Sequence, residues 1–163
     1  MNKLNSMKFT VRKAITEDVE YLLSCFNSAV INIDAQVYSD EQKRAWVRKG
    51  RDNYEKWLQR IENQYFVIAE SNNQIIGFVS VSLEGYVDLL FTHPDFQRKG
   101  IADTLYNQAE NYLREMGVTK LDTHASTVSR PFFEKKGFVL QKEKNLELYG
   151  VPISNFHLIK TFN

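Results

Sequence analysis

Gln97-Arg98-Lys99-Gly100-Ile101-Ala102 joins an apolar, β-rich run to a segment with helical periodicity. A helix that begins at Ile101 leaves its first backbone N–H groups without partners inside the helix. The helix dipole and the charges of Arg98 and Lys99 favour an anion there, and Gly100 lets a phosphate approach the backbone without a Cβ in the way. The stretch therefore predicts a pyrophosphate site, although basic residues before a helix also occur on solvated loops.

The common nucleotide-binding loops have other sequences. The chain contains neither the P-loop pattern Gly-x-x-x-x-Gly-Lys-Ser/Thr nor the dinucleotide pattern Gly-x-Gly-x-x-Gly. P-loop and Rossmann interpretations therefore lose their main support.

Hydrophobic periodicity predicts an α/β protein with a mixed sheet. Apolar residues alternate with polar ones or form β-rich runs in seven segments, and they recur at helical spacing in four regions. The expected strands are 9–14, 65–70, 75–83, 86–92, 120–125, 138–148 and 151–162. The expected helices are 19–30, one or two helices between 39 and 61, 101–116 and 129–136.

Length and composition limit the classes of function. A chain of 163 residues with 43% hydrophobic and 25% charged residues suits one folded domain. The net charge of +1 gives no general field that would attract nucleic acid or an anionic membrane. Cys25 is the only cysteine, which excludes an intramolecular disulfide and a cysteine metal cluster, so we expect no metal and a reducing cytoplasm. No apolar run has the length of a signal peptide or a membrane span.

Two signatures resemble the GNAT superfamily of N-acetyltransferases. The stretch 89–102, Leu-Leu-Phe-Thr-His-Pro-Asp-Phe-Gln-Arg-Lys-Gly-Ile-Ala, resembles the family's strand, proline turn and Arg/Gln-x-x-Gly-x-Gly/Ala motif, with Ala102 in place of the final glycine. The stretch 131–138, Pro-Phe-Phe-Glu-Lys-Lys-Gly-Phe, resembles its short helix ending in Gly-Phe. The resemblance covers nearly the whole chain and implies a single domain over 1–163. It also implies a mixed, mostly antiparallel sheet of about seven strands flanked by about four helices.

The resemblance implies acetyl-CoA as the acyl donor and direct attack by a substrate amine on its thioester. Backbone N–H groups around Arg98 to Ala102 would hold the pyrophosphate. The strand from Leu90 to Thr92 would run beside the pantetheine arm, with the acyl carbon at a gap between neighbouring strands. The expected cofactor-binding residues are Leu90, Phe91, Thr92, Gln97, Arg98, Lys99, Gly100, Ile101, Ala102, Ser129, Phe132 and Phe133.

Asp88 and His124 are the candidate catalytic residues. Asp88 occupies a strand position where some family members carry a carboxylate as general base, and burial in an apolar strand raises a carboxyl pKa unless the group is paired. A structural ion pair or a solvent-facing position is the alternative. His124 ends the following strand and can relay a proton near neutral pH, or else be a packed or surface histidine.

The second signature departs from the family at one position. Many members have a tyrosine four residues before the signature glycine, where its hydroxyl protonates the departing thiolate, whereas this chain has Phe133. Tyr106 or Ser129 could donate instead, or the thiolate leaves without assistance. Phe133 also favours an alternative function, a non-catalytic acyl-CoA-binding or sensor domain.

The acceptor is expected to be the amine of a small molecule or a peptide, contacted by Tyr38, Tyr86 and Tyr149. The sequence does not identify it further. Aromatic strands near the C-terminus suggest that two copies of the chain could pair as a homodimer.

Overall fold

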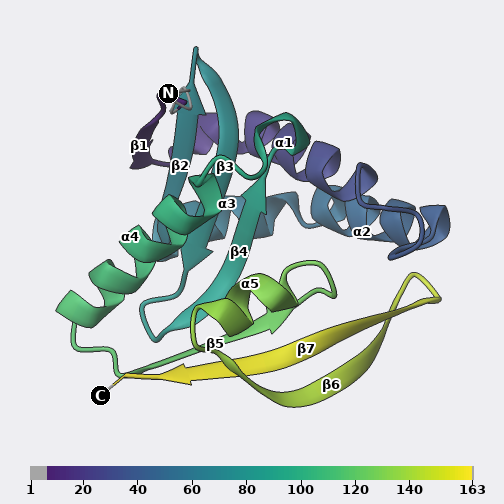
Figure 1. The fold of residues 1–163 in the computed structure, drawn as a ribbon. Coiled ribbons are helices and arrows are strands. Elements are labelled where there is room, and N and C mark those ends of the chain that lie inside the picture. Colours follow the sequence, from purple (N-terminus) through teal and green to yellow (C-terminus); the bar gives the residue numbers. More distant parts are fainter. Residues whose placement is uncertain (1–6, 163) are drawn as a thin grey trace, which may run out of the picture.

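The computed structural model describes residues 7–162, which form an open sheet of seven strands in the order β1-β2-β3-β4-β5-β7-β6 (Figure 1). Neighbouring strands are antiparallel except β4 and β5, which are parallel. The mixed, mostly antiparallel sheet expected from the sequence is confirmed. The strands are β1 Thr10–Lys13, β2 Tyr65–Ser71, β3 Gln74–Val81, β4 Tyr86–Thr92, β5 Lys120–Ala125, β6 Val139–Leu148 and β7 Val151–Thr161.

Five α-helices flank the sheet in the described part of the chain, together with 3-10 turns at Thr16–Asp18 and Pro94–Phe96. The region expected to form one or two helices forms two, because the chain leaves helical geometry at Asn53, which ends α2 and begins α3. None of these helices is long and apolar enough to cross a membrane. The helices are α1 Val19–Ile31, α2 Asp40–Asp52, α3 Tyr54–Asn63, α4 Ile101–Glu115 and α5 Arg130–Lys135.

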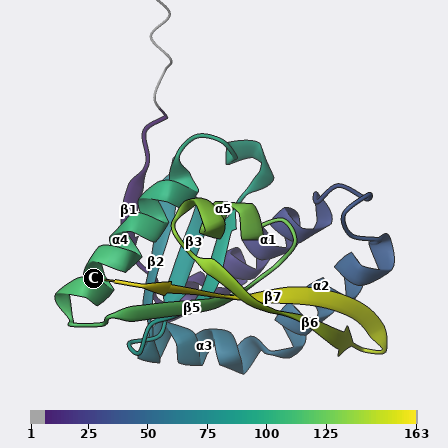
Figure 2. The ribbon, with the colours of Figure 1, turned by 60° about the horizontal axis from the view of Figure 1, so that its bottom comes forward.

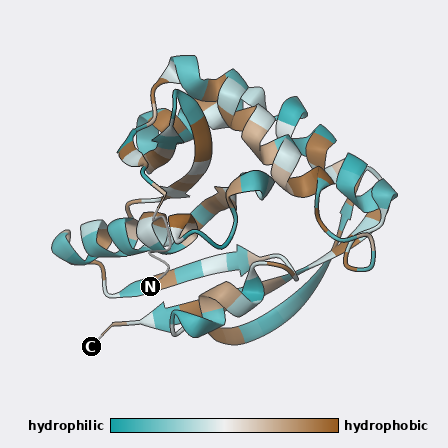
Figure 3. Ribbon diagram, turned by 45° about the horizontal axis from the view of Figure 1, so that its top comes forward, coloured by the Kyte–Doolittle hydropathy of each residue, from teal (hydrophilic) through white to brown (hydrophobic). Residues whose placement is uncertain are grey.

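The central strands are buried on both faces. In β2, Val67 packs into the cluster shared with α4 and α5, whereas the next residue, Ile68, packs into the cluster shared with α1 and α3. Strands covered on both faces read as continuous apolar runs rather than alternating ones, as the sequence of β2 and β3 does. The helices show hydrophilic and hydrophobic bands in Figure 3, consistent with one face toward the sheet.

The parallel pair β4–β5 opens part of the way along its length. The strands pair at Tyr86 with Asp122 and at Val87 with Thr123, and no further pair joins them although both strands continue. On the other side of β4, a β-bulge inserts Asp88 between the residues paired with Ser80 and Val81. Bulges bend the strand that carries them. The two strands therefore separate beyond Val87, as Figure 1 shows.

The two C-terminal strands form a long hairpin that extends past the rest of the sheet. Its turn contains Tyr149 and Gly150, both with positive φ, and β6 lies at the edge of the sheet. The far end of the hairpin reaches α2 (Figure 2), where Gln42 Nε2 donates to the carbonyl of Pro152 at 3.0 Å. The hairpin thus closes one side of the space that β4 and β5 leave open.

Candidate active site

The N-terminus of α4 is open to an anion, as the sequence predicted. Gly100 precedes the helix with φ of 80°, and no side chain caps the free N–H groups of the first turn. Arg98 also has a positive φ, which is uncommon for a residue other than glycine, so the loop makes two sharp turns before the helix. A Cβ added at Gly100 would meet no atom within 4 Å. The space beside Gly100 is therefore unobstructed.

The remaining residues of this loop differ in how far their side chains are exposed to solvent. The side chains of Gln97 and Lys99 are exposed, Ala102 is half-buried, and Ile101 is 1% exposed and packs against the sheet. Ile101 can therefore face a ligand only through its backbone. Charged side chains, free N–H groups and an open approach suit a pyrophosphate.

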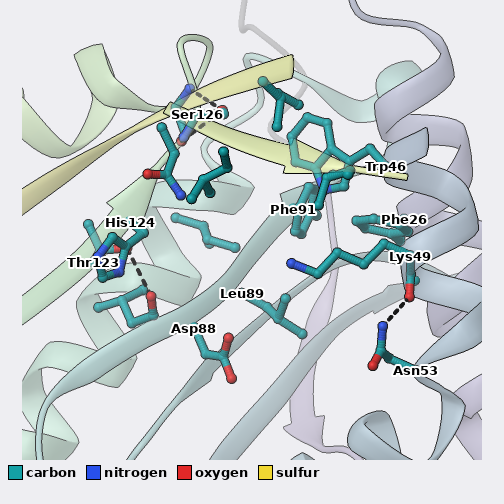
Figure 4. Close-up of a pocket in the computed structure, with 18 of the residues that line it drawn as sticks. Phe26, Trp46, Lys49, Asn53, Asp88, Leu89, Phe91, Thr123, His124 and Ser126 are labelled. Atoms are coloured by element: carbon teal, nitrogen blue, oxygen red, sulfur yellow. Dashed lines mark hydrogen bonds between the residues drawn. The ribbon is translucent and has the colours of Figure 1, made fainter. Parts of the chain in front are cut away.

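A separate cleft lies along β4 from Tyr86 to Phe91, where β4 and β5 separate, and no residue of the loop 97–102 lines it (Figure 4). Its walls come from β4, from α2 and α3, from the ends of β5 and β7, and from α5. The structure brings together most of the predicted residues of the catalytic region. The predicted residues that line the cleft are Tyr38, Tyr86, Asp88, Leu90, Phe91, His124, Ser129 and Phe133.

Asp88 lines the cleft as part of an ion pair. Its Oδ2 accepts from Nε of Arg60 at 2.8 Å and from Nε2 of Gln64 at 2.9 Å, and its Oδ1 accepts from Nη2 of Arg60 at 3.3 Å. The Arg60 and Asp88 side chains are 12% and 14% exposed. The ion pair that the sequence analysis left open as the alternative is therefore present. Oδ1, which has the longest of the three contacts, is the oxygen with room for a substrate N–H.

His124 connects two other polar groups. Its Nε2 lies 3.1 Å from Nζ of Lys144, and its Nδ1 lies 3.0 Å from the hydroxyl of Tyr86. A protonated lysine can only donate, so Nε2 accepts and Nδ1 carries the ring proton toward Tyr86. Burial, and then the positive charge of Lys144 and the neighbouring His157, hold the pKa of His124 below its ordinary value.

The hydroxyl of Tyr86 is shielded from water at the same wall. Burial, reinforced by the nearby carboxylates of Asp88 and Asp122, raises the pKa of Tyr86 to about 12. Tyr86 therefore keeps its proton at neutral pH and can serve as a hydrogen-bond donor or acceptor toward a substrate.

The residues considered as proton donors to the departing thiolate have other contacts in the structure. Phe133 lines the cleft and is 3% exposed, so its ring shapes the wall without offering a proton. The hydroxyl of Tyr106 donates to Glu110 at 2.7 Å, and Tyr106 does not line the cleft, so these contacts do not support it as the proton donor to the thiolate. Ser129 lies at the cleft, but its hydroxyl already bonds to Ser126 at 3.0 Å. Phe132 packs edge-on against Tyr106 rather than into the cleft.

The three predicted substrate-binding tyrosines separate into two groups. Tyr86 and Tyr38 line the cleft, and the Tyr38 hydroxyl accepts from the backbone N–H of Thr127 at 2.9 Å. Tyr149 lies outside it, 44% exposed, with its hydroxyl 2.6 Å from Asp52. The assignment of Tyr149 to the substrate is therefore corrected: the hairpin turn carries it against the outer side of α2.

The sequence analysis missed several polar residues of the cleft, among them Lys49 on α2, Lys56 on α3 and Asn155 on β7. Lysines on an amphipathic helix usually lie on its solvated face, so the residue type alone did not indicate that Lys49 and Lys56 line a cleft. Their position depends on the angle between α2 and α3 and on the path of the hairpin, neither of which periodicity specifies.

An uncapped helix N-terminus and a parallel strand pair that separates agree with the resemblance of the sequence to the GNAT superfamily. Residues 34–159 match the family model described as an acetyltransferase (GNAT) domain. The protein belongs to the GNAT family of N-acetyltransferases and is an acyltransferase enzyme.

Individual relatives agree with this assignment. The chain is 30% identical over 141 residues to the uncharacterized N-acetyltransferase YafP of Escherichia coli strain K12, covering 86% of this chain and 88% of YafP. It is 26% identical to the spermidine N(1)-acetyltransferase of Thermoplasma acidophilum, covering 83% and 91% of the two chains. The fold superposes with a TM-score of 0.89 on a GCN5-related N-acetyltransferase from Rhodopseudomonas palustris, at 25% identity over 99% of this chain and all of the other.

Proposed function

We propose that the protein transfers the acetyl group of acetyl-CoA to a primary amine of a small molecule or peptide. The observation that carries this proposal is the separation of β4 from β5 beyond Val87, which leaves a cleft containing Asp88 and His124 beside the strand that leads along the chain to the uncapped N-terminus of α4. A donor held along this path has its phosphates at the helix and its acyl group beside the polar groups that handle an amine.

The identity of the donor is supported by solved relatives. A PaiA N-acetyltransferase from Thermoplasma acidophilum, described in complex with coenzyme A, superposes with a TM-score of 0.76 at 23% identity over 96% of this chain and all of that one. Acetyl-CoA, when bound, supplies an activated acyl group that an amine can attack directly. The N–H groups of Ile101 and Ala102 and the charges of Arg98 and Lys99 would bind its pyrophosphate. Leu90 to Thr92 would lie along its pantetheine arm.

The two catalytic candidates have different roles: Asp88 positions the amine, and His124 accepts its proton. Asp88, through its less engaged Oδ1, holds the amine with its nitrogen toward the acyl carbon. His124, kept unprotonated by the lowered pKa of its ring, takes the proton that the amine loses once Lys144 releases Nε2. Positioning supplies much of the remaining rate enhancement.

The proposal is tested by release of free thiol from acetyl-CoA in the presence of a panel of amines. We expect thiol release that depends on one class of amine, together with an acetylated product seen by mass spectrometry. The name of the Thermoplasma relative places polyamines on that panel. Phe133, which offers no proton to a thiolate, favours the alternative of a non-catalytic acyl-CoA sensor. Acetyl-CoA binding without turnover on any amine would support the sensor.

The rate is expected to fall in acid through the ionisation of His124. Because its pKa is lowered, the ring is unprotonated at neutral pH and becomes protonated only below its ordinary pKa of about 6.5. The pH profile of kcat/KM should therefore show an ionisation below pH 6.5, in addition to the more alkaline ionisation of the amine substrate. His124→Gln should lose the acid ionisation and keep the alkaline one. An unchanged profile in this variant would remove His124 as the proton acceptor.

Three further expectations stay predictions: a single domain over 1–163, a cytoplasmic location and a homodimer. The surface that supports a homodimer is the edge strand β6, most of whose residues are exposed, including Val139 at 62% and Leu146 at 39%.

A further inference from the structure

One wall of the cleft carries an excess of positive charge. Lys49, Lys56 and Arg60, on α2 and α3, all line the cleft. Asp88 is the only carboxylate among the described residues that line it, and Arg60 already pairs with this group. The three cations therefore outnumber the single carboxylate, in a protein whose overall charge is close to neutral.

The ammonium of Lys49 faces the cleft. Figure 4 shows its side chain extending from α2 past Leu89, with its nitrogen toward the space between Asp88 and Phe91. Within residues 7–162, neither Lys49 nor Lys56 donates its ammonium to a hydrogen bond or ion pair. Removal from water and repulsion by Lys56 and Arg60 lower the pKa of Lys49. An anion between the two lysines would relieve this repulsion.

The other walls suit the rest of a small amine. Trp46 and Phe91 offer aromatic surface, with ring centroids 6.1 Å apart. Asn155 lines the cleft, and its Oδ1 is buried without a hydrogen-bond partner among the described residues. Buried polar atoms are normally satisfied, so this oxygen is available to accept from a ligand N–H.

We infer that the acetyl acceptor is an amino acid or a similar small amino carboxylate, whose carboxylate lies between Lys49 and Lys56 and whose amine lies toward Asp88 and His124. The inference rests on the proposed function and specifies its substrate class. A polyamine or a plain alkylamine would add positive charge to a cleft that already has an excess. A carboxylate close to the amine neutralises that excess and fixes the direction in which the amine enters.

The test compares each of the standard amino acids with its own amide in the thiol-release assay. The two members of a pair share side chain and amine and differ in the charge of the carboxyl group. We expect kcat/KM for the best amino acid to exceed that for its amide by about tenfold or more, as for a charged hydrogen bond. The amide has the less basic amine, so amine ionisation cannot produce this preference.

The double variant Lys49→Gln/Lys56→Gln tests whether the two lysines cause the preference for an amino acid over its amide. We expect its ratio of amino acid to amide to fall close to one while activity on the amide persists. Lys142→Gln, which changes an exposed lysine of β6 outside the cleft, is the matched control and should keep the ratio.

The outcomes separate this inference from the proposed function. Equal or greater activity on amides, or on 1,5-diaminopentane, would overturn the inference while leaving the acetyltransferase function intact. A preference for amino acids that survives in the double variant would overturn the role of the two lysines. Absence of turnover on every amine would overturn both proposals.

Discussion

Replacing Gly100 with glutamate is expected to weaken acetyl-CoA binding by about 100-fold or more, a loss of several charge-assisted hydrogen bonds. The new carboxylate would compete with phosphate for the free N–H groups at the start of α4 and would repel it. The fold has room for the side chain, because a Cβ at this position meets nothing within 4 Å. Calorimetric titration with acetyl-CoA measures the effect.

Gly100→Ala is the matched control. Both variants force a residue with a Cβ into a backbone with φ of 80°, which costs about 1–2 kcal/mol, so they share the backbone strain and differ in size and charge. Thermal unfolding should be similar for the two proteins, while the Kd for acetyl-CoA rises far more for glutamate. A glutamate variant that binds as tightly as the alanine variant would show that the phosphates lie elsewhere.

Asp88→Asn is expected to lower kcat/KM for the amine by about 100-fold, because the amine loses the carboxylate that positions it for attack. The substitution removes the only carboxylate among the described cleft residues, while the Kd for acetyl-CoA should change little. It also leaves Arg60 without its partner. Loss of one partner from a buried ion pair costs about 3–5 kcal/mol, so the midpoint of thermal unfolding should fall as well.

The double variant Arg60→Gln/Asp88→Asn distinguishes the effect of Asp88 on the stability of the fold from its effect on turnover. Removing both charges leaves no unpaired ion in the wall, so we expect much of the lost stability to return. Turnover should stay low, because the carboxylate that holds the amine is still absent. If activity returned together with stability, Asp88 would be a structural residue that serves to balance the charge of Arg60.

The fold and the uncapped N-terminus of α4 could be predicted because their signals are local. The strand at 86–92, the turn before the helix and the periodicity of α4 lie within about thirty consecutive residues. A glycine before a helix indicates a backbone with positive φ, which residues with a Cβ rarely adopt, and Gly100 has φ of 80° in the structure. The departure at Phe133 could also be read from the sequence, and its ring does line the cleft.

The acceptor side of the site could not be predicted in the same way, because its contacts join distant segments. Asp88 pairs with an arginine 28 residues earlier, on a helix that crosses the end of the sheet. His124 meets Lys144 only because the hairpin adds β7 and β6 to the sheet next to β5. Tyr149 is carried away from the cleft by the same hairpin. Residue type and spacing within one helix or strand do not predict these contacts between distant segments.

The central claim is that the free N–H groups of α4 and the gap between β4 and β5 hold acetyl-CoA with its acyl group in the cleft. A crystal structure of the protein soaked with acetyl-CoA tests it most directly. We predict the pyrophosphate at the backbone of Arg98 to Ala102, the pantetheine arm beside Leu90 to Thr92, and the acyl carbon facing Asp88 and His124. A pyrophosphate bound away from α4, or an acyl group outside the cleft, would contradict the account.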